Sequence, residues 1–210
     1  AIVVSLLAET LVRVGNVDYV RSNKSYGLTT LRDRHLKPAR GGRARLSFRG
    51  KGGQRHDVPL DDAKLAALVK RCQQLPGQAL FQYRDDDGKL RPVDSGEVND
   101  YLRERMGEAF TAKDFRTWGG TLAAFQRLAR TPLPEDADAS ESALAALEKA
   151  VVCEAAAVLG NTPTVCRKAY IDPCVFTGWR DGSLQRAAAS ARGERQWEAA
   201  ALRFLRKAHR

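Results

Sequence analysis

The sequence predicts an α+β fold that is mostly α-helical, with a small antiparallel β-sheet near its N-terminal side. Apolar residues recur at helical spacing through much of the chain, beginning with Leu6, Leu7, Leu11 and Val14. From residue 26 to about residue 60 the pattern changes to short alternating pieces rich in Thr, Phe and Val, which is typical of strands. With 210 residues, 43% of them hydrophobic, the chain can bury a core of this kind.

The N-terminal helix is expected to end at Gly15, because glycine readily adopts the backbone conformation that closes a helix. Arg13 would then lie at the C-terminus of that helix. Residues 44–48 and 56–58 follow as two strands of a hairpin, and the glycine-rich turn between them carries Lys51. A lysine in such a turn faces solvent unless a ligand engages it.

Three helices are predicted after the hairpin. The first is capped by Asp61 and ended by the Pro-Gly pair at residues 76–77, the second covers residues 95–106, and the third covers residues 111–130. The two glycines at residues 119–120 weaken the third helix locally and indicate close packing against another element.

Residues 131–139 form the clear helix-breaking stretch, rich in proline and acidic residues. We expect this stretch to separate an α+β part, residues 1–130, from a helical part, residues 140–210. In the helical part, an amphipathic helix is predicted to begin at Ser140. Two more helical segments are predicted at residues 183–192 and 194–207.

A short helix is predicted to lead to Tyr170. Thr162 can act as its N-cap, and Pro163 suits the first helical position, where its missing N–H costs nothing. A single tyrosine at a helix end is most often an ordinary core or surface aromatic residue. Its meaning here depends on the motifs that accompany it.

The charge of the chain favours a polyanionic partner. Its 35 Lys and Arg residues against 25 Asp and Glu residues give a formal net charge of +10. Residues 37–55 contain seven basic residues and no acidic one. The glycines among them would let the backbone approach a phosphate chain, so we expect a nucleic acid to bind here.

Cysteines and histidines give no metal-binding pattern in the sequence. The four cysteines form no C-x-x-C pair and the three histidines are scattered, so no metal site is predicted and the thiols are expected to be reduced. No apolar run approaches the roughly 20 residues that span a membrane, and no signal peptide is visible. We expect a cytoplasmic, nucleoid-associated monomer with no membrane partner. Because the chain begins at Ala1 and its only methionine is Met106, we also expect it to lack an N-terminal portion.

Four ordered motifs are the most specific feature of the sequence. They are LVRVG with NKSYGLTTL at residues 11–15 and 23–31, GKGG at 50–53, KDFRTWG at 113–119, and LGNTPTVCRKAY at 159–170. Together they resemble the motifs of type IB DNA topoisomerases, most closely the small bacterial and poxvirus enzymes. The resemblance implies the catalytic core of a DNA breaking-rejoining enzyme, with an N-terminal DNA-clamp domain absent from this chain.

The resemblance also implies a mechanism. Tyr170 would attack one strand of double-stranded DNA to form a 3′-phosphotyrosyl intermediate, and religation would leave the DNA relaxed, without ATP, metal or another cofactor. Arg13 and Arg116 would bind the scissile phosphate, because guanidinium groups stay charged and match phosphate oxygens in pairs. Lys51 would protonate the leaving 5′ oxygen. Asn161 stands where the family often has histidine, and it can donate a hydrogen bond but no proton.

Several further residues are predicted to contact DNA. Tyr19 and Thr30 stand where small poxvirus-like members place DNA-contacting side chains. Six basic residues near the motifs complete this set. They are Lys24, Arg49, Arg55, Lys113, Arg167 and Lys168.

Two alternatives remain open on the sequence. Tyrosine recombinases and integrases share the Arg, Lys, Arg and Tyr chemistry, but they usually carry His-x-x-Arg where this chain has Lys113-Asp114-Phe115-Arg116. A basic DNA-binding module without catalysis would make Tyr170 incidental. Relaxation of supercoiled DNA that carries no specific pair of recognition sites would distinguish a topoisomerase from a recombinase. A covalent adduct between protein and DNA would exclude the non-catalytic module.

Overall fold

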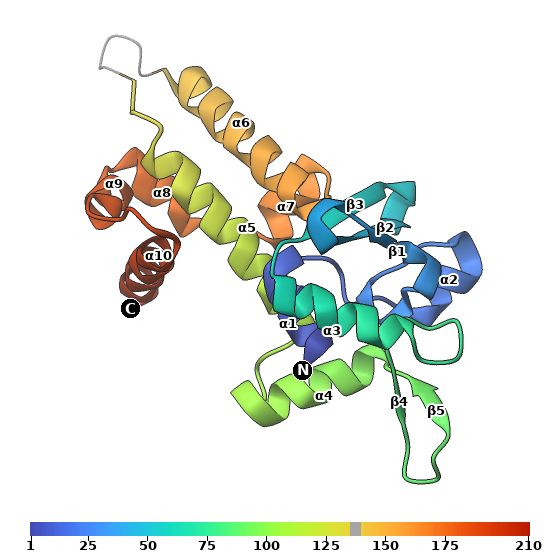
Figure 1. The fold of residues 1–210 in the computed structure, drawn as a ribbon. Helices are drawn as coiled ribbons and strands as arrows, with labels where there is room; N and C mark the ends of the chain where they lie inside the picture. Colours follow the sequence, from blue (N-terminus) through green and yellow to red (C-terminus); the bar gives the residue numbers. More distant parts are fainter. Residues whose placement is uncertain (135–139) are drawn as a thin grey trace. The chain divides into compact units, whose positions relative to one another are not determined.

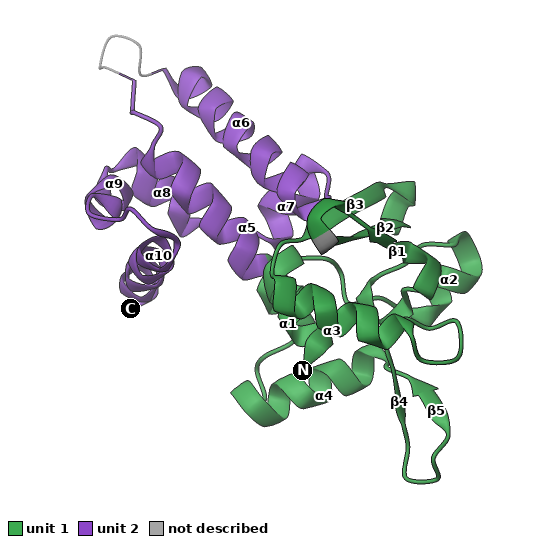
Figure 2. Cartoon of the chain, viewed as in Figure 1, with its two compact units in different colours: residues 1–116 green, residues 117–210 purple. Residues whose placement is uncertain are grey.

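The computed structural model describes residues 1–134 and 140–210 (Figure 1). These residues form two compact units, residues 1–116 and 117–210, which are described here one at a time (Figure 2). Unit 1 combines helices with two small antiparallel sheets, and unit 2 is helical in the residues described. The predicted α+β fold with a small sheet near the N-terminal side is therefore confirmed.

Unit 1 contains four complete α-helices and five strands among its described residues. The helices are α1 (Ile2–Thr10), α2 (Val17–Asn23), α3 (Ala63–Gln73) and α4 (Ser95–Met106). The strands are β1 (Leu36–Pro38), β2 (Ala44–Arg49), β3 (Arg55–Leu60), β4 (Gln82–Arg84) and β5 (Leu90–Pro92).

The main sheet has the order β1-β2-β3, with both pairs antiparallel. Along β2 the side chains of Ala44, Leu46 and Phe48 are buried, while those between them face outward. This alternation places the apolar face of the sheet in the unit 1 core. The predicted hairpin is confirmed, and its turn holds Lys51 between β2 and β3. The second hairpin, β4 with β5, was not predicted.

Helix α1 ends earlier than the sequence predicts. Leu11 takes a left-handed conformation with φ 53° as the C-cap, and its N–H donates to the carbonyl of Leu7 at 3.1 Å. The Thr10 hydroxyl also donates to the Leu6 carbonyl at 2.6 Å. The prediction that Arg13 lies at a helix C-terminus is wrong, because the chain leaves the helix before reaching it.

Two other predictions in unit 1 need correction. The N-cap of α3 is Asp62 and not Asp61, since the Asp62 carboxylate accepts from the N–H groups of Lys64 and Leu65 at 2.7 and 3.1 Å. Helix α2, capped by Asn16, was not predicted. The predicted bounds of α4 are confirmed.

Unit 2 consists of helices in its described residues, and α5 (Ala112–Ala129) enters it from unit 1. The other helices are α6 (Glu141–Leu159), α7 (Pro163–Ala169), α8 (Cys174–Arg180), α9 (Ser183–Ala188) and α10 (Glu194–Ala208). The predicted helices are confirmed for α5, for α6 with its Ser140 cap, and for α7 with its Thr162 cap. Helix α8 was not predicted, and α9 is shorter than expected.

Aromatic side chains fill the core of unit 2. Trp179 on α8 is fully buried, and its indole N–H donates to the carbonyl of Thr131 at 2.9 Å. Phe125 on α5 packs against Trp197 and Phe204 of α10, with ring centroids 6.3 and 5.6 Å apart. The predicted break at residues 131–139 lies partly outside the described residues, and the division into units falls before it, after Arg116.

Close packing at Gly120 confirms the interpretation of the glycine pair in α5. A Cβ at this position would lie 2.5 Å from the carbonyl oxygen of Tyr170 and 3.0 Å from Cδ1 of Leu159. Backbone therefore touches backbone where α5 passes the end of α7.

We predict that Gly120→Ala destabilises unit 2. Alanine favours a helix interior by about 1 kcal/mol over glycine, but the clash with a backbone carbonyl should cost more, about 1–3 kcal/mol. Gly193→Ala is the control, because no atom lies within 4 Å of a Cβ there. Urea unfolding measures both variants. An alanine at residue 120 that raises the unfolding midpoint would contradict the packing argument.

Candidate active site

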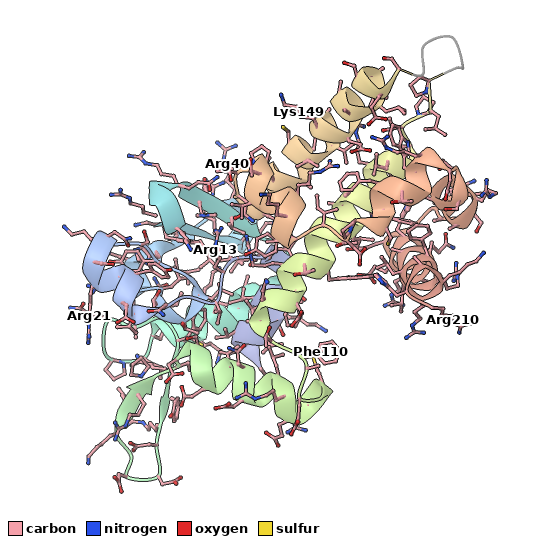
Figure 3. All side chains as sticks on the ribbon, turned by 180° about the vertical axis from the view of Figure 1, so that it is seen from behind. Arg13, Arg21, Arg40, Phe110, Lys149 and Arg210 are labelled. Atoms are coloured by element: carbon pink, nitrogen blue, oxygen red, sulfur yellow. The ribbon has the colours of Figure 1, made fainter. Side chains whose placement is uncertain are left out.

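The backbone at Arg13 is held against a second segment of unit 1. Its carbonyl accepts a hydrogen bond from the N–H of Leu28 at 2.9 Å. Gly27 allows this approach, because a Cβ there would lie 2.6 Å from the Arg13 carbonyl oxygen. The Arg13 side chain is half-buried, whereas that of Arg21 extends into solvent (Figure 3). The two pieces of the first sequence motif thus form one structural unit.

Arg116 joins this segment from the second turn of α5. It is only 3% exposed, and its Nη1 donates to the carbonyl of Leu11. Two arginines that are far apart in the sequence are therefore anchored to one short stretch, residues 11–13. Buried guanidinium groups need such acceptors, because desolvation of an unpaired charge is costly.

His56 on β3 lies beside both arginines, and sequence reasoning missed it. Burial, and then the charges of Arg13 and Arg116, lower the pKa of this histidine. Its ring stacks on Phe48 of β2, with centroids 4.9 Å apart and planes 10° from parallel. A lowered pKa keeps the imidazole neutral, so it adds no positive charge next to the guanidinium pair. The sequence around His56 carried no signal for this position, because Arg13 and Arg116 come from distant parts of the chain.

Lys51 is exposed in the turn between β2 and β3, and its ammonium group lies over the ring of Tyr19, 5.1 Å from the centroid. This cation–π contact links α2 to the hairpin turn. The structure therefore brings together Tyr19 and Lys51, which the sequence predicts as separate DNA-facing residues. Gly52 and Gly53 have φ values of 72° and 78°, so the turn uses backbone conformations that favour glycine.

The exposed face of the hairpin is strongly basic. Arg49 and Arg55 are direct partners in the β2–β3 register, and like charges in such a position repel each other. Arg45 is bonded to Asp57 at 3.0 Å on the same face. All seven basic residues between residues 37 and 55 are exposed. An anion bound at this face would relieve the repulsion between Arg49 and Arg55.

The other predicted DNA contacts in unit 1 occupy varied positions. Lys24 is exposed and caps α2 in a left-handed conformation with φ 53°. The hydroxyl of Thr30 accepts from the N–H of Gly27 at 2.9 Å and donates to its carbonyl at 3.0 Å, so it also stabilises its own turn. Lys113 is exposed on the first turn of α5. Their contact with DNA stays a prediction.

Tyr170 ends α7 in unit 2, as the sequence predicts. Its N–H donates to the carbonyl of Cys166 at 3.0 Å, and its own carbonyl accepts from the Thr121 hydroxyl at 3.4 Å. That hydroxyl also accepts from the N–H of Asp172 at 3.1 Å. Helix α5 therefore holds the backbone that directly follows the half-buried tyrosine.

Asn161 occupies the turn between α6 and α7. Its N–H donates to the Ala156 carbonyl at 2.9 Å, following Gly160 in a left-handed conformation. The N-cap of α7 is Thr162, whose hydroxyl accepts from the N–H of Val165. Because Thr162 fills the capping role, capping does not account for the asparagine.

A buried ion network connects α7 to the rest of unit 2. Glu148 on α6 is 3% exposed, and its carboxylate accepts from Arg167 of α7 and from Arg180 of α8, both at 2.7 Å. The Arg167 guanidinium also lies over the ring of Phe176, 4.2 Å from the centroid. These contacts give Arg167 a structural role, and its predicted contact with DNA stays a prediction. Lys168 beside it is exposed.

Each unit thus carries one part of the predicted site. Unit 1 contains Arg13, Lys51 and Arg116, and unit 2 contains Asn161 and Tyr170. Within unit 1 the two arginines share one anchoring segment, and within unit 2 the asparagine and the tyrosine stand at opposite ends of α7.

A family model of the catalytic core of eukaryotic DNA topoisomerase I matches residues 1–175 of the chain, which include all five of these residues. The chain belongs to the type IB DNA topoisomerases. A DNA topoisomerase 1B of Acanthamoeba polyphaga mimivirus is 34% identical to this topoisomerase-family chain over 180 residues. The match covers 80% of the chain and 52% of the viral protein, so the chain spans about half the length of this curated relative.

The family assigned from the four motifs is therefore confirmed, and it is not that of the tyrosine recombinases. Residues 176–210 lie beyond the matched region, where the sequence shows helical periodicity and no motif. No helix in the described part of this topoisomerase-family chain has the length and apolar character needed to cross a membrane.

We predict that Glu148→Ala strongly destabilises unit 2. The variant removes the buried acceptor that Arg167 and Arg180 share, although Arg180 keeps its pair with Glu141, and the loss of hydrogen bonds to a charged group costs about 1.5–3 kcal/mol. Glu154→Ala, on the same helix, is the matched control. Its carboxylate pairs with Arg127 at 3.0 Å, but both side chains are 54% exposed, so the loss should be below about 1 kcal/mol. Thermal unfolding of both variants measures the difference, and equal losses would contradict a structural role for Glu148.

Proposed function

We propose that this chain relaxes supercoiled double-stranded DNA by cutting one strand, letting the duplex rotate and resealing it. Family membership supports topoisomerase activity, and the site residues support a specific mechanism. The observation that carries the proposal is that Arg116 donates to Leu11, two residues before Arg13, and that both arginine charges act on His56, which supports two guanidinium groups acting on one phosphate.

The first chemical step is attack by the Tyr170 hydroxyl on a DNA phosphate. The phenol loses its proton to solvent water, a new bond forms between the phenolic oxygen and phosphorus, and the bond to the 5′ oxygen of the next nucleotide breaks. The product is a 3′-phosphotyrosyl link. Phenolate is a tolerable leaving group, so a 5′ hydroxyl can reverse the reaction without ATP.

The second requirement is stabilisation of charge on the phosphate. Negative charge builds on the two non-bridging oxygens in the transition state, and the Arg13 and Arg116 guanidinium groups would bind them. Asn161 would add one neutral hydrogen bond to the same phosphate, but its amide cannot transfer a proton. The neutral His56 ring, beside both arginines, would leave their charge available to the DNA.

The third requirement is a proton for the leaving 5′ oxygen. Lys51 is the proposed general acid. Its place in an exposed turn, with Tyr19 under its ammonium group, supports a residue that reaches into DNA rather than one buried in the protein. The basic face of β2 and β3 around it would bind the phosphates on either side.

Plasmid relaxation and trapping of a covalent adduct with detergent test the proposal together. Relaxation without ATP or a paired recognition site, accompanied by a protein–DNA adduct, is the expected result. Binding without any adduct would instead support a basic DNA-binding module without catalysis. The expected monomer and its cytoplasmic, nucleoid-associated location stay predictions.

We predict that Tyr170→Phe abolishes the covalent adduct and relaxation while leaving DNA affinity nearly unchanged. The substitution removes one hydroxyl and none of the basic surface. Tyr101→Phe on α4 is the control and should keep full activity. Gel electrophoresis of detergent-treated reactions measures the adduct, and filter binding measures affinity. An adduct in the Phe variant would show that another residue is the nucleophile.

We predict that Lys51→Ala slows strand cleavage by about 10²- to 10⁴-fold, the usual contribution of a general acid. A substrate with sulfur in place of the 5′ bridging oxygen should restore the rate, because a thiolate leaves without a proton. Lys64→Ala, an exposed lysine on α3, should cleave both substrates at the parental rate. If sulfur gives no rescue, Lys51 is not the acid.

A further inference from the structure

Three side chains with metal-ligating atoms meet in unit 2, and none of them belongs to the site residues assigned above. Ligand atoms of Asp172, Cys174 and His209 all lie within 4.8 Å of one another. Asp172 lies in the loop that follows Tyr170, Cys174 begins α8, and His209 caps the end of α10. Their sequence spacing gives no metal pattern, because His209 comes from a distant part of the chain.

The group is ordered by hydrogen bonds of its own. One carboxylate oxygen of Asp172 accepts from the N–H of Cys174 at 3.0 Å, and the other lies 2.8 Å from Nε2 of His209. The Asp172 backbone is fixed in turn by the Thr121 hydroxyl of α5. Helices α8 and α10 thus contact the carboxylate while α5 holds its backbone, and the three ligand atoms need little movement to surround an ion.

The types of ligand favour one class of metal. Zn²⁺ binds thiolate, imidazole and carboxylate groups at about 2.0–2.3 Å, usually with four ligands in a tetrahedron. Mg²⁺ and Ca²⁺ prefer oxygen ligands throughout, which a cysteine and a histidine do not supply. Three protein ligands would leave the fourth position for water or an anion.

The surroundings allow a fourth ligand to enter from solvent. Cys174 lines a hollow of about 690 Å³ in unit 2, whose walls also include Arg186, Arg203 and Lys207. These cations oppose the binding of a bare metal ion, but they favour an anionic fourth ligand such as chloride or phosphate. Burial, and then the hydrogen bond to Asp172, raise the pKa of the Cys174 thiol to about 12, so the metal must displace the thiol proton when it binds.

We propose that Asp172, Cys174 and His209 bind a Zn²⁺ ion, which ties the end of α10 to the loop that follows Tyr170. The ion is not part of the cleavage chemistry. It would stabilise the helical unit, because it binds the folded arrangement of three elements and not the unfolded chain.

Cobalt(II) is the probe that tests ligation directly, since thiolate binding produces a charge-transfer absorption band and a tetrahedral site produces strong visible bands. The wild-type chain is expected to bind one Co²⁺ with both signals, and Zn²⁺ should displace it. Cys174→Ser should lose the charge-transfer band. Cys153→Ser, an exposed cysteine on α6, is the matched control and should keep it.

A second variant tests whether Co²⁺ binds to all three side chains or to the Cys174 thiol alone. His209→Gln lies at the exposed end of α10, so the unit should fold normally, and we expect it to weaken Co²⁺ binding at least tenfold. Added Zn²⁺ should raise the melting temperature of the wild type and of Cys153→Ser, but not of His209→Gln. Absence of bound Co²⁺ in the wild type, or a band retained by Cys174→Ser, overturns the proposal. Unchanged affinity in His209→Gln overturns it as well. None of these readouts depends on DNA cleavage.

Discussion

A buried guanidinium must find hydrogen-bond acceptors, and this requirement organises the functional part of unit 1. Arg116 is almost completely buried, and the carbonyl of Leu11 accepts one of its N–H groups. That carbonyl is available because α1 ends at Thr10, so Leu11 lies outside the helix. Arg13 follows two residues later with its backbone fixed against Leu28. The end of one helix thus sets the place of both arginines.

Unit 2 contains a buried carboxylate, which likewise needs hydrogen-bonding partners of opposite charge. The buried Glu148 carboxylate is compensated by Arg167 and Arg180, which belong to the helices on either side of the loop after Tyr170. An apolar pair of the same size would pack with less desolvation cost, but an ion network accepts only partners in a defined geometry. The network therefore restricts how α7 can sit on α6. The contact of Gly120 with the Tyr170 carbonyl restricts the same helix from α5.

These restraints matter for a reaction that depends on position. Phosphoryl transfer to a tyrosine needs a fixed nucleophile and fixed cations, and displacement of either by about 1 Å can cost about 10²-fold in rate. The arginines, the hairpin lysine and the tyrosine are each held by short, named contacts inside their own unit. The proposed zinc ion would add a restraint on the loop next to the tyrosine without taking part in the chemistry.

Local patterns in the sequence were enough to predict much of this protein. Some features depend only on neighbouring residues and can be predicted without knowledge of the fold. They are the Thr162-Pro163 start of α7, the Ser140 cap of α6 and the β2–β3 hairpin. The order of the motifs was also sufficient for the family. The seven basic side chains of residues 37–55, which led to the expectation of a nucleic-acid partner, are all exposed, because alternation along β2 buries the apolar side chains instead.

Only the tertiary structure decided the features that depend on distant contacts. Helical periodicity continues through Leu11 and Val14, so the end of α1 at Thr10 could not be predicted. Likewise, nothing near His56 in the sequence marks its place beside two arginines, and the cluster of Asp172 and Cys174 with His209 needs α10 to return to α8. Periodicity and capping describe energies between residues a few positions apart. The partners of a buried charge or a metal ligand are chosen by packing across the whole unit, where sequence distance has no bearing on contact.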